Sequence, residues 1–388
     1  MGQMTGRADT GHEVSTSFSF HVRSELFAGL HALDHLPLEL QRVQCPSPFV
    51  IYRDDREGRH LYKLLRRCMK QTKLRGFIGM CIDGSHEGFE ELMEMCKLFV
   101  SSECTGIIAL GGGSLQAWAK FLNAAASSFS ASPDAQPPAD FSELAEYTCT
   151  EHHRFYPLFS VLTDHLDGRE AAGTAELYGC CLSHAALVPS RIFLDSRGYP
   201  QGSITHTART ALFALAQFLE AVRPSRTSPL IEMYVRSGLL SLHHGIMHMQ
   251  SQEGRHASAC AAVYASMIQP NILPGPLTSL AALCSSSGLA SQAEVVHALL
   301  PDMLELIKSR HGAALSFLDS LPVLLGLPQD TDGISWIEDL EQRAFAHADA
   351  DGQRDVIVNL ARNTSRLASS MQAAEVLELL DTSLKGAR

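Results

Sequence analysis

The residues with the clearest chemical meaning are Gly111, Gly112, Gly113 and Ser114, which follow an apolar run (residues 105–110) and precede a helical pattern. Backbone N–H groups at the start of a helix attract anions, and residues without a Cβ let a phosphate approach the backbone closely. This pattern predicts a phosphate-binding turn between a strand and a helix. We call residues 111–114 the glycine loop.

A second group of polar residues offers acid-base chemistry. Asp164 and His165 place a carboxyl group beside an imidazole, and Asp167 and Glu170 follow within the same short stretch. Groups of these types transfer protons when they lie in a cleft. The alternative interpretation is a solvated loop without a catalytic role.

Composition limits the classes of function. The chain has 388 residues, 45% of them hydrophobic and 19% charged, which is enough for a full core and for two domains. The net charge is −11 without a run of Lys or Arg, so nucleic acid and an anionic membrane are unfavourable partners, and a small molecule is favoured. Scattered cysteines without C-x-x-C spacing indicate reduced thiols, and we expect a cytoplasmic protein.

Hydrophobic patterning divides the chain into an α/β part and an all-α part. Short apolar runs alternate with helical patterns up to about residue 200, which predicts a Rossmann-like parallel sheet with helices on its faces. Beyond that point the patterns are helical. We therefore expect a disordered tail (1–16), an α/β nucleotide-binding-like domain (17–202) with a flexible Ser/Ala/Pro-rich insertion (127–140), and an all-helical domain (203–388). The expected strands are 48–52, 77–82, 105–110, 158–163 and 190–194. The expected helices are 58–72, 87–101, 208–222, 229–250, 257–269, 291–310, 334–346 and 373–385.

The glycine loop, together with Ala119 and Lys120, resembles the G-G-G-S-x-x-D-x-A-K motif of the iron-type alcohol dehydrogenases and their relatives, the maleylacetate reductases and dehydroquinate synthases. The resemblance extends over about residues 18 to 385. It implies an active-site cleft between the two domains, and a homodimer is common in that family. It also implies cofactor contacts from residues 111–114, Lys120, Asp54 at the end of the first nucleotide strand, and Thr163 at the start of a second phosphate loop.

The metal-binding half of the family's site differs here. The family's helical motif D-A-L-A-H-A-x-E, whose Asp and His bind the metal, is matched by Phe213 and Gln217 ahead of Glu220. The two further histidine ligands fall at Thr278 and Gln292. A phenyl ring, two amides and a hydroxyl do not hold a divalent ion in water, so we expect no metal. These four residues either fill a core or line a pocket in which the amides donate hydrogen bonds to a substrate carbonyl.

The cofactor half is altered as well. If residues 163–170 form the second phosphate loop, Asp164 and Asp167 lie near the pyrophosphate, where a like charge at about 5 Å costs roughly 3 kcal/mol. An alternative alignment puts residues 172–176 on this loop and spares the cofactor. NAD(P)H binding is therefore left open.

Three functions follow from these observations. The favoured one is a metal-free enzyme of small-molecule biosynthesis, of the kind found in secondary metabolism, that catalyses a non-redox cyclisation or isomerisation and requires no cofactor. Its site residues are Gln217, Gln292, Thr278, Phe213, His165 and Asp164. The first alternative is a metal-independent NAD(P)H-dependent oxidoreductase similar to maleylacetate reductase. The second is a catalytically inactive scaffold.

Overall fold

The protein is described from a computed structural model. The described residues are 18–70, 78–82, 88–131, 138–150, 155–199, 204–222, 228–272, 275–286, 290–310, 313–328 and 330–348. The expected N-terminal tail (1–16) and the expected helix at 373–385 lie outside them.

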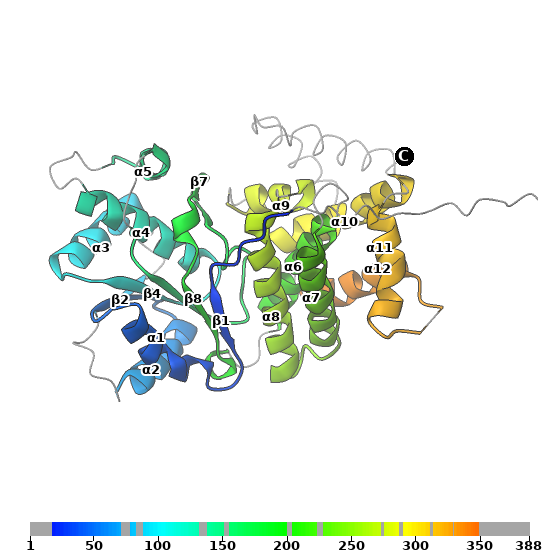
Figure 1. Cartoon of the computed structure of the whole chain (residues 1–388), viewed down its shortest axis with the longest axis horizontal. Coiled ribbons are helices and arrows are strands. Elements are labelled where there is room, and N and C mark those ends of the chain that lie inside the picture. Colours follow the sequence, from blue (N-terminus) through cyan, green and yellow to red (C-terminus); the bar gives the residue numbers. More distant parts are fainter. Residues whose placement is uncertain are drawn as a thin grey trace, which may run out of the picture.

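A six-stranded parallel sheet forms the first part of the chain, with the strand order β1-β8-β5-β4-β2-β3. Helices α1 and α2 cover one face of this sheet, and α3 and α4 cover the other (Figure 1). The strands are β1 (Glu25–Ala28), β2 (Pro48–Arg53), β3 (Ile78–Ile82), β4 (Gly106–Leu110), β5 (Leu158–Leu162) and β8 (Arg191–Leu194). The helices of this part are α1 (Leu36–Arg42), α2 (Arg56–Met69), α3 (Phe89–Ser101), α4 (Ser114–Ala131) and α5 (Phe141–Thr150).

Both faces of the sheet are buried, which explains its continuous apolar strands. Ile107 and Ala109 of β4 join the core beneath α3 and α4, whereas the alternating Ile108 and Leu110 join the core beneath α1 and α2. Side chains on a strand alternate between faces, so one apolar run supplies two cores.

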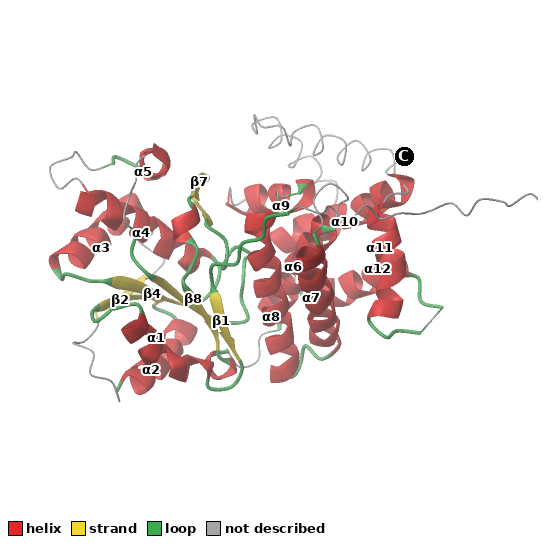
Figure 2. Cartoon of the chain, in the orientation of Figure 1, coloured by secondary structure: helices red, strands yellow, loops and turns green. Residues whose placement is uncertain are grey.

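The second part of the chain is helical (Figure 2). Its helices are α6 (Thr205–Ala221), α7 (Pro229–Met247), α8 (Gln252–Ile268), α9 (Pro276–Ser286), α10 (Gln292–Arg310), α11 (Ala313–Leu324) and α12 (Gly333–Phe345). Helix α6 is buried along nearly its whole length and packs against α7, α8, α10 and α12, so it is the central element of this domain. The expected combination of an α/β part and an all-α part is confirmed.

Some elements differ from the sequence-based expectation. Helix α4 continues to Ala131, so the first residues of the expected flexible insertion at 127–140 are helical, and Ser127 and Ser128 are buried in it. Both Ser127 and Ser128 hydroxyls bond to the residue four positions earlier, which removes their cost inside the helix. Residues 132–137 of that segment lie outside the described residues.

A two-stranded hairpin, β6 (Thr174–Leu177) and β7 (Cys180–Ser183), was not expected from the sequence. Its turn has positive φ at Tyr178 and Gly179, 51° and 76°, which is the conformation of a tight hairpin turn. None of the described helices is long and apolar enough to cross a membrane.

Candidate functional site

The glycine loop joins β4 to α4 at the carboxyl edge of the sheet. Gly111 and Gly113 have φ of +136° and +60°, a region that disfavours side chains. Gly112 is constrained differently, because a Cβ built on it would lie 1.6 Å from the carbonyl oxygen of His165. The middle glycine is therefore required by the packing of one loop on another.

The stretch that covers the glycine loop is the second loop (residues 163–170). Helix α6 fixes it through Thr210, whose hydroxyl accepts from the Leu166 N–H at 2.9 Å and lies within bonding distance of the Asp164 and Leu166 carbonyls. The Glu170 carboxylate accepts from the Asp167 N–H at 2.6 Å. The loop is thus held by α6 and by a hydrogen bond within itself.

Lys120 was expected to contact a cofactor, and the structure gives it a different partner set. Its side chain is 1% exposed, and Nζ donates to the carbonyls of Arg169, Ala172 and Thr174 at 2.7, 2.8 and 2.9 Å. Burial lowers the pKa of Lys120 to about 8. An ammonium group has three N–H donors, so this arrangement leaves none for a phosphate. Lys120 holds the segment that follows the second loop.

Two further expected cofactor residues, Ser114 and Asp54, have arginine partners. The guanidinium of Arg53 donates to the hydroxyl of Ser114 at the start of α4. Asp54 pairs with Arg59, with 2.6 Å between Oδ1 and Nε. Arg53 thus brings a positive charge to the glycine loop, while the carboxylate of Asp54 is engaged by its own neighbour.

Asp164 and Thr163 lie buried under α6 and α8. The Oδ2 atom of Asp164 accepts from Thr207 at 2.8 Å and lies 3.5 Å from Arg255, whereas its Oδ1 has no hydrogen-bond partner among the described residues. Burial raises the pKa of Asp164. Glu57 reaches this cluster through Thr163, and burial raises the pKa of Glu57 as well.

His165 lies at the junction of the two loops. Its ring stacks on His206 with centroids 4.1 Å apart and lies beside Gly113. His165 is exposed, yet the surrounding protein and the neighbouring His206 lower the pKa of His165 to about 4. The imidazole is therefore neutral at pH 7 and is a weak base.

A cavity of about 780 Å³ lies on the other side of the second loop. Phe213 and Gln217, one turn apart on α6, line it together with Thr278 of α9. Its remaining wall comes from the chain before β1, from the β6–β7 hairpin and from α8, and most of the lining is apolar. The volume is in the range of small-molecule sites.

Gln217 connects this cavity to the second loop. Its Nε2 donates to the carbonyl of Gly168 at 2.9 Å, and its buried Oε1 has no partner among the described residues. Because Gly168 offers a carbonyl, the amide must turn its nitrogen toward it. One N–H of the amide is then bonded within the protein, and the oxygen, which has almost no exposed surface, has no partner among the described residues.

Thr278 and Gln292 are placed differently from each other. The Thr278 hydroxyl donates to Glu220, whose carboxylate also accepts from the Leu277 N–H at 2.6 Å and so caps α9. Thr278 therefore faces the cavity with its hydroxyl already bonded. Gln292 begins α10 and is absent from the cavity lining.

These residues do not fit a catalytic metal. Phe213 has no ligating atom, the Thr278 hydroxyl is bonded to Glu220, and Gln292 does not line the cavity, so among these four residues the Gln217 oxygen would be a single neutral ligand. The described residues also contain no cluster of three or more His, Cys, Asp or Glu that could hold an ion.

The sequence analysis did not predict two parts of the cavity wall. Arg169 lines it and pairs with Glu176 of the hairpin at 3.0 Å. Residues 21–24, ahead of β1, also lie on its wall. The Tyr-Gly dipeptide at 178–179 was the available signal for the hairpin, whereas nothing local marked residues 21–24.

Comparison with known structures identifies the fold. An iron-containing alcohol dehydrogenase from Thermococcus thioreducens superposes with a TM-score of 0.74 at 16% identity, covering 95% of this chain and 100% of that one. A 1,3-propanediol oxidoreductase gives 0.73 at 14% identity, covering 95% and 100%. Maleylacetate reductase from a Rhizobium species gives 0.67 at 16% identity, covering 96% and 99%. The chain therefore has the fold of the iron-containing alcohol dehydrogenases. No protein-family model and no curated protein sequence matches it.

Proposed function

We propose that the chain is an enzyme of small-molecule biosynthesis that binds an organic intermediate in the cavity beside α6 and promotes a non-redox cyclisation or isomerisation without a metal ion. The observation that carries this proposal is the cavity wall itself. At the positions where the resemblance puts metal ligands, Phe213 and Gln217 line an apolar space, and the buried amide oxygen has no partner in the described part of the chain.

The geometry supports binding and orientation as the source of catalysis. An apolar wall at Phe213 holds the carbon skeleton, and Oε1 of Gln217 accepts from a hydroxyl or enol of the substrate. Fixing a flexible molecule in a reactive conformation removes an entropic part of the barrier. The Gly168 carbonyl bonds Nε2 of Gln217 and so fixes the direction of the amide.

The alternative, an NAD(P)H-dependent reductase, is favoured by a different observation. Gly111 and Gly113 keep positive φ values, and Arg53 supplies a cation at Ser114, where the resemblance puts a pyrophosphate. Two observations oppose the reductase alternative. Lys120 donates its three N–H groups to backbone carbonyls, and the buried Asp164 lies in the second loop, which covers the glycine loop.

Titration of the full chain with NADH and NADPH, followed by nucleotide fluorescence, tests the choice. We expect no saturable binding at submillimolar concentrations and no stoichiometric iron or zinc in the same sample. Tight, stoichiometric binding of either nucleotide would replace the proposal with the reductase, and a bound metal would overturn the assignment of the four altered positions.

The cavity is tested separately with 8-anilinonaphthalene-1-sulfonate, an aromatic probe that fluoresces in apolar sites. Ala282 of α9 is buried and lines the cavity, so Ala282→Phe should abolish most of the bound signal. Leu240→Phe, on the exposed face of α7, is the matched control. Equal signals in both variants would remove the cavity as the binding site.

A further inference from the structure

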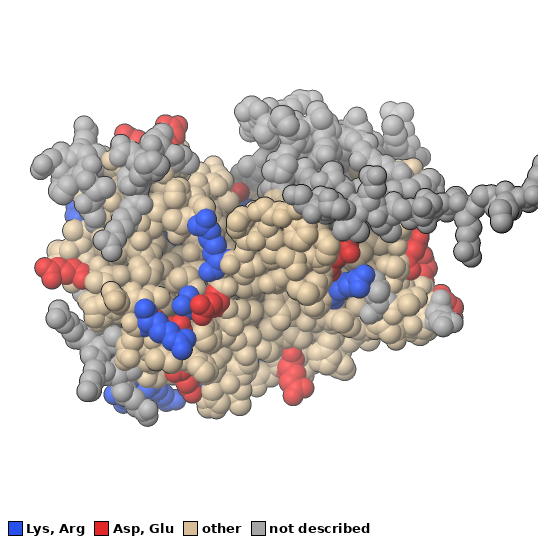
Figure 3. All heavy atoms as spheres, viewed as in Figure 1, with Lys and Arg blue, Asp and Glu red and all other residues tan. Residues whose placement is uncertain are grey.

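Helix α2 carries an unusual share of the positive charge. Five of the 31 Lys and Arg residues of the chain lie in its 14 residues, although the net charge of the protein is −11. These are Arg56, Arg59, Lys63, Arg66 and Arg67, and all five are exposed. On the face shown in Figure 3, charged side chains are sparse over the helical domain and more frequent over the α/β domain.

One side of this helix borders a cavity of about 470 Å³, which we call the α2 pocket. His60, Lys63 and Arg67 contribute from α2, Arg197 from the short helix η3 (Ser196–Gly198) after β8, and Asp34 from η1 (Ala32–His35) after β1. It shares no lining residue with the cavity beside α6. The pocket is therefore a separate site.

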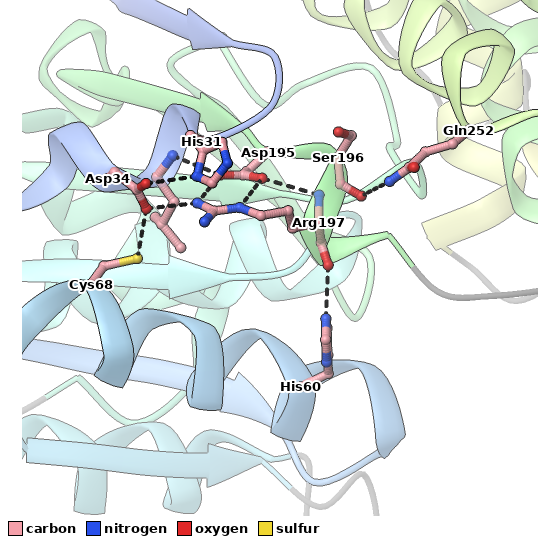
Figure 4. Close-up of polar contacts among 9 residues, drawn as sticks. His31, Asp34, His60, Cys68, Asp195, Ser196, Arg197 and Gln252 are labelled. Carbon is pink, nitrogen blue, oxygen red and sulfur yellow. Dashed lines mark hydrogen bonds and ion pairs between the residues drawn. The ribbon is translucent and has the colours of Figure 1, made fainter.

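Arg197 is held rigidly in this pocket. Its Nε and Nη2 donate to Asp195 at 2.9 and 2.6 Å, and Nη2 also donates to Asp34 at 2.7 Å. Figure 4 shows the guanidinium between these two carboxylates, on the side of the sheet where α2 lies. These contacts raise the pKa of Arg197, so it is always charged. Nη1 has no partner among the described residues, which leaves two oriented N–H donors.

The two carboxylates would repel an anion if they were not offset. Asp195 is 1% exposed and also accepts from the Leu33 N–H at 3.0 Å, and Asp34 accepts from the Cys68 thiol at 3.2 Å. Arg197 and the two carboxylates together carry a charge of −1. Lys63 and Arg67 outweigh it, and within the described part of the chain neither forms an ion pair.

Hydrogen bonds within the protein fix the backbone around the pocket before any ligand binds. The His60 ring bonds to the carbonyl of Arg197 at 2.8 Å, and Gln252 of α8 donates to the Ser196 carbonyl at 2.6 Å (Figure 4). The distance between α2 and η3 is thus set in advance. A preorganised pair of donor groups binds more tightly than a mobile one.

We infer that the α2 pocket binds a small multivalent oxyanion, of the kind carried by a diphosphate or a phosphate ester. A planar guanidinium with two free N–H groups suits a tetrahedral oxyanion, and flexible Lys63 and Arg67 close over it from α2. A volume of about 470 Å³ suits a small molecule better than an extended acidic partner.

Calorimetric titration of the full chain with inorganic pyrophosphate at low ionic strength tests this inference. We expect saturable binding at or below about 1 mM, weakened at least about 10-fold in Lys63→Ala/Arg67→Ala, since a hydrogen bond to a charged group contributes about 1.5–3 kcal/mol. Both side chains are exposed, so the variant should keep the melting temperature of the wild type.

Two controls make the outcome decisive. Arg66→Ala removes the same charge from the next residue, which does not line the pocket, and should change affinity by no more than about 2-fold. Arg53→Ala removes the cation at the glycine loop and should leave pyrophosphate binding unchanged. An equal loss in Arg66→Ala, a loss in Arg53→Ala, or absence of binding in the wild type would each overturn the inference. Binding of acidic peptide or RNA without pyrophosphate would replace the pocket with an extended cationic face.

Discussion

The two sides of the second loop differ in how many of their polar groups are already bonded within the protein. On the glycine-loop side, the donors of Lys120, the carbonyl of His165 and the hydroxyl of Ser114 all contact other parts of the chain. On the cavity side, the lining is mostly apolar and the Gln217 oxygen is unengaged among the described residues. The first side serves to hold loops of the α/β part together, and the second leaves space beside α6.

The largest effect is expected from Gly112→Ala. Its Cβ would lie 1.6 Å from the His165 carbonyl oxygen, so one of the two loops must move. We expect a loss of at least about 3 kcal/mol in the free energy of unfolding, measured by urea denaturation. Gly113→Ala is the control, because its Cβ has nothing closer than 3.9 Å, and the positive φ alone should cost about 1 kcal/mol. Equal losses would mean that the contact between the loops is not formed in solution.

Lys120→Met should come next. The substitution keeps the volume but leaves the carbonyls of Arg169, Ala172 and Thr174 without their donor. We expect a loss of about 2 kcal/mol by the same denaturation experiment. Lys97→Met on the exposed face of α3 should change stability by less than about 0.5 kcal/mol. If Lys120→Met were as stable as Lys97→Met, the three hydrogen bonds would make no net contribution to the free energy of unfolding.

Gln217→Leu distinguishes a role of the cavity side in ligand binding from a role in stability. It loses the bond to Gly168 but also removes a buried oxygen without a partner, so stability should change by no more than about 1 kcal/mol. Turnover should fall at least about 10-fold if a substrate hydroxyl bonds to this amide. Gln292→Leu, away from the cavity, should leave turnover within about 2-fold. Full activity in Gln217→Leu would remove this amide from the mechanism.

The last prediction concerns pH. The pKa of His165 is about 4 in the folded protein and about 6.5 when unfolded, so the unfolded chain binds more protons between these values. This residue therefore lowers stability as the pH falls from about 6.5 to about 4. His165→Gln should show a shallower decline than the wild type in this window, by thermal melting. Identical slopes would show that the ring is not held between His206 and the glycine loop.

The sequence predicted the strands whose apolar pattern recurs along the chain. Buried runs such as residues 105–110 and 158–163 were found because parallel strands covered on both faces are continuously apolar. Strand β1 has only four residues and lies at the sheet edge, so its pattern was too short to recognise. The end of α4 was misjudged because Ser and Ala suit both a linker and a buried helix.

The site was predictable where its residues lie on the same helix. Phe213 and Gln217 are one helical turn apart, so the resemblance that assigned one of them to a site assigned the other to the same side of the helix. Gln292 was placed by an alignment that crosses the start of another helix, and the structure sets it off the cavity wall. The directions of the Gln217 amide and the Thr278 hydroxyl depend on Gly168 and Glu220, which are remote in sequence.

The contact between Gly112 and His165 has a consequence for how such chains change over time. A glycine that is needed to seat a neighbouring loop is selected by folding, whether or not a ligand binds beside it. Such a turn is therefore evidence of how two loops pack and is not by itself evidence of nucleotide binding. For proteins built like this one, the chemistry must be sought among the residues that folding leaves unused.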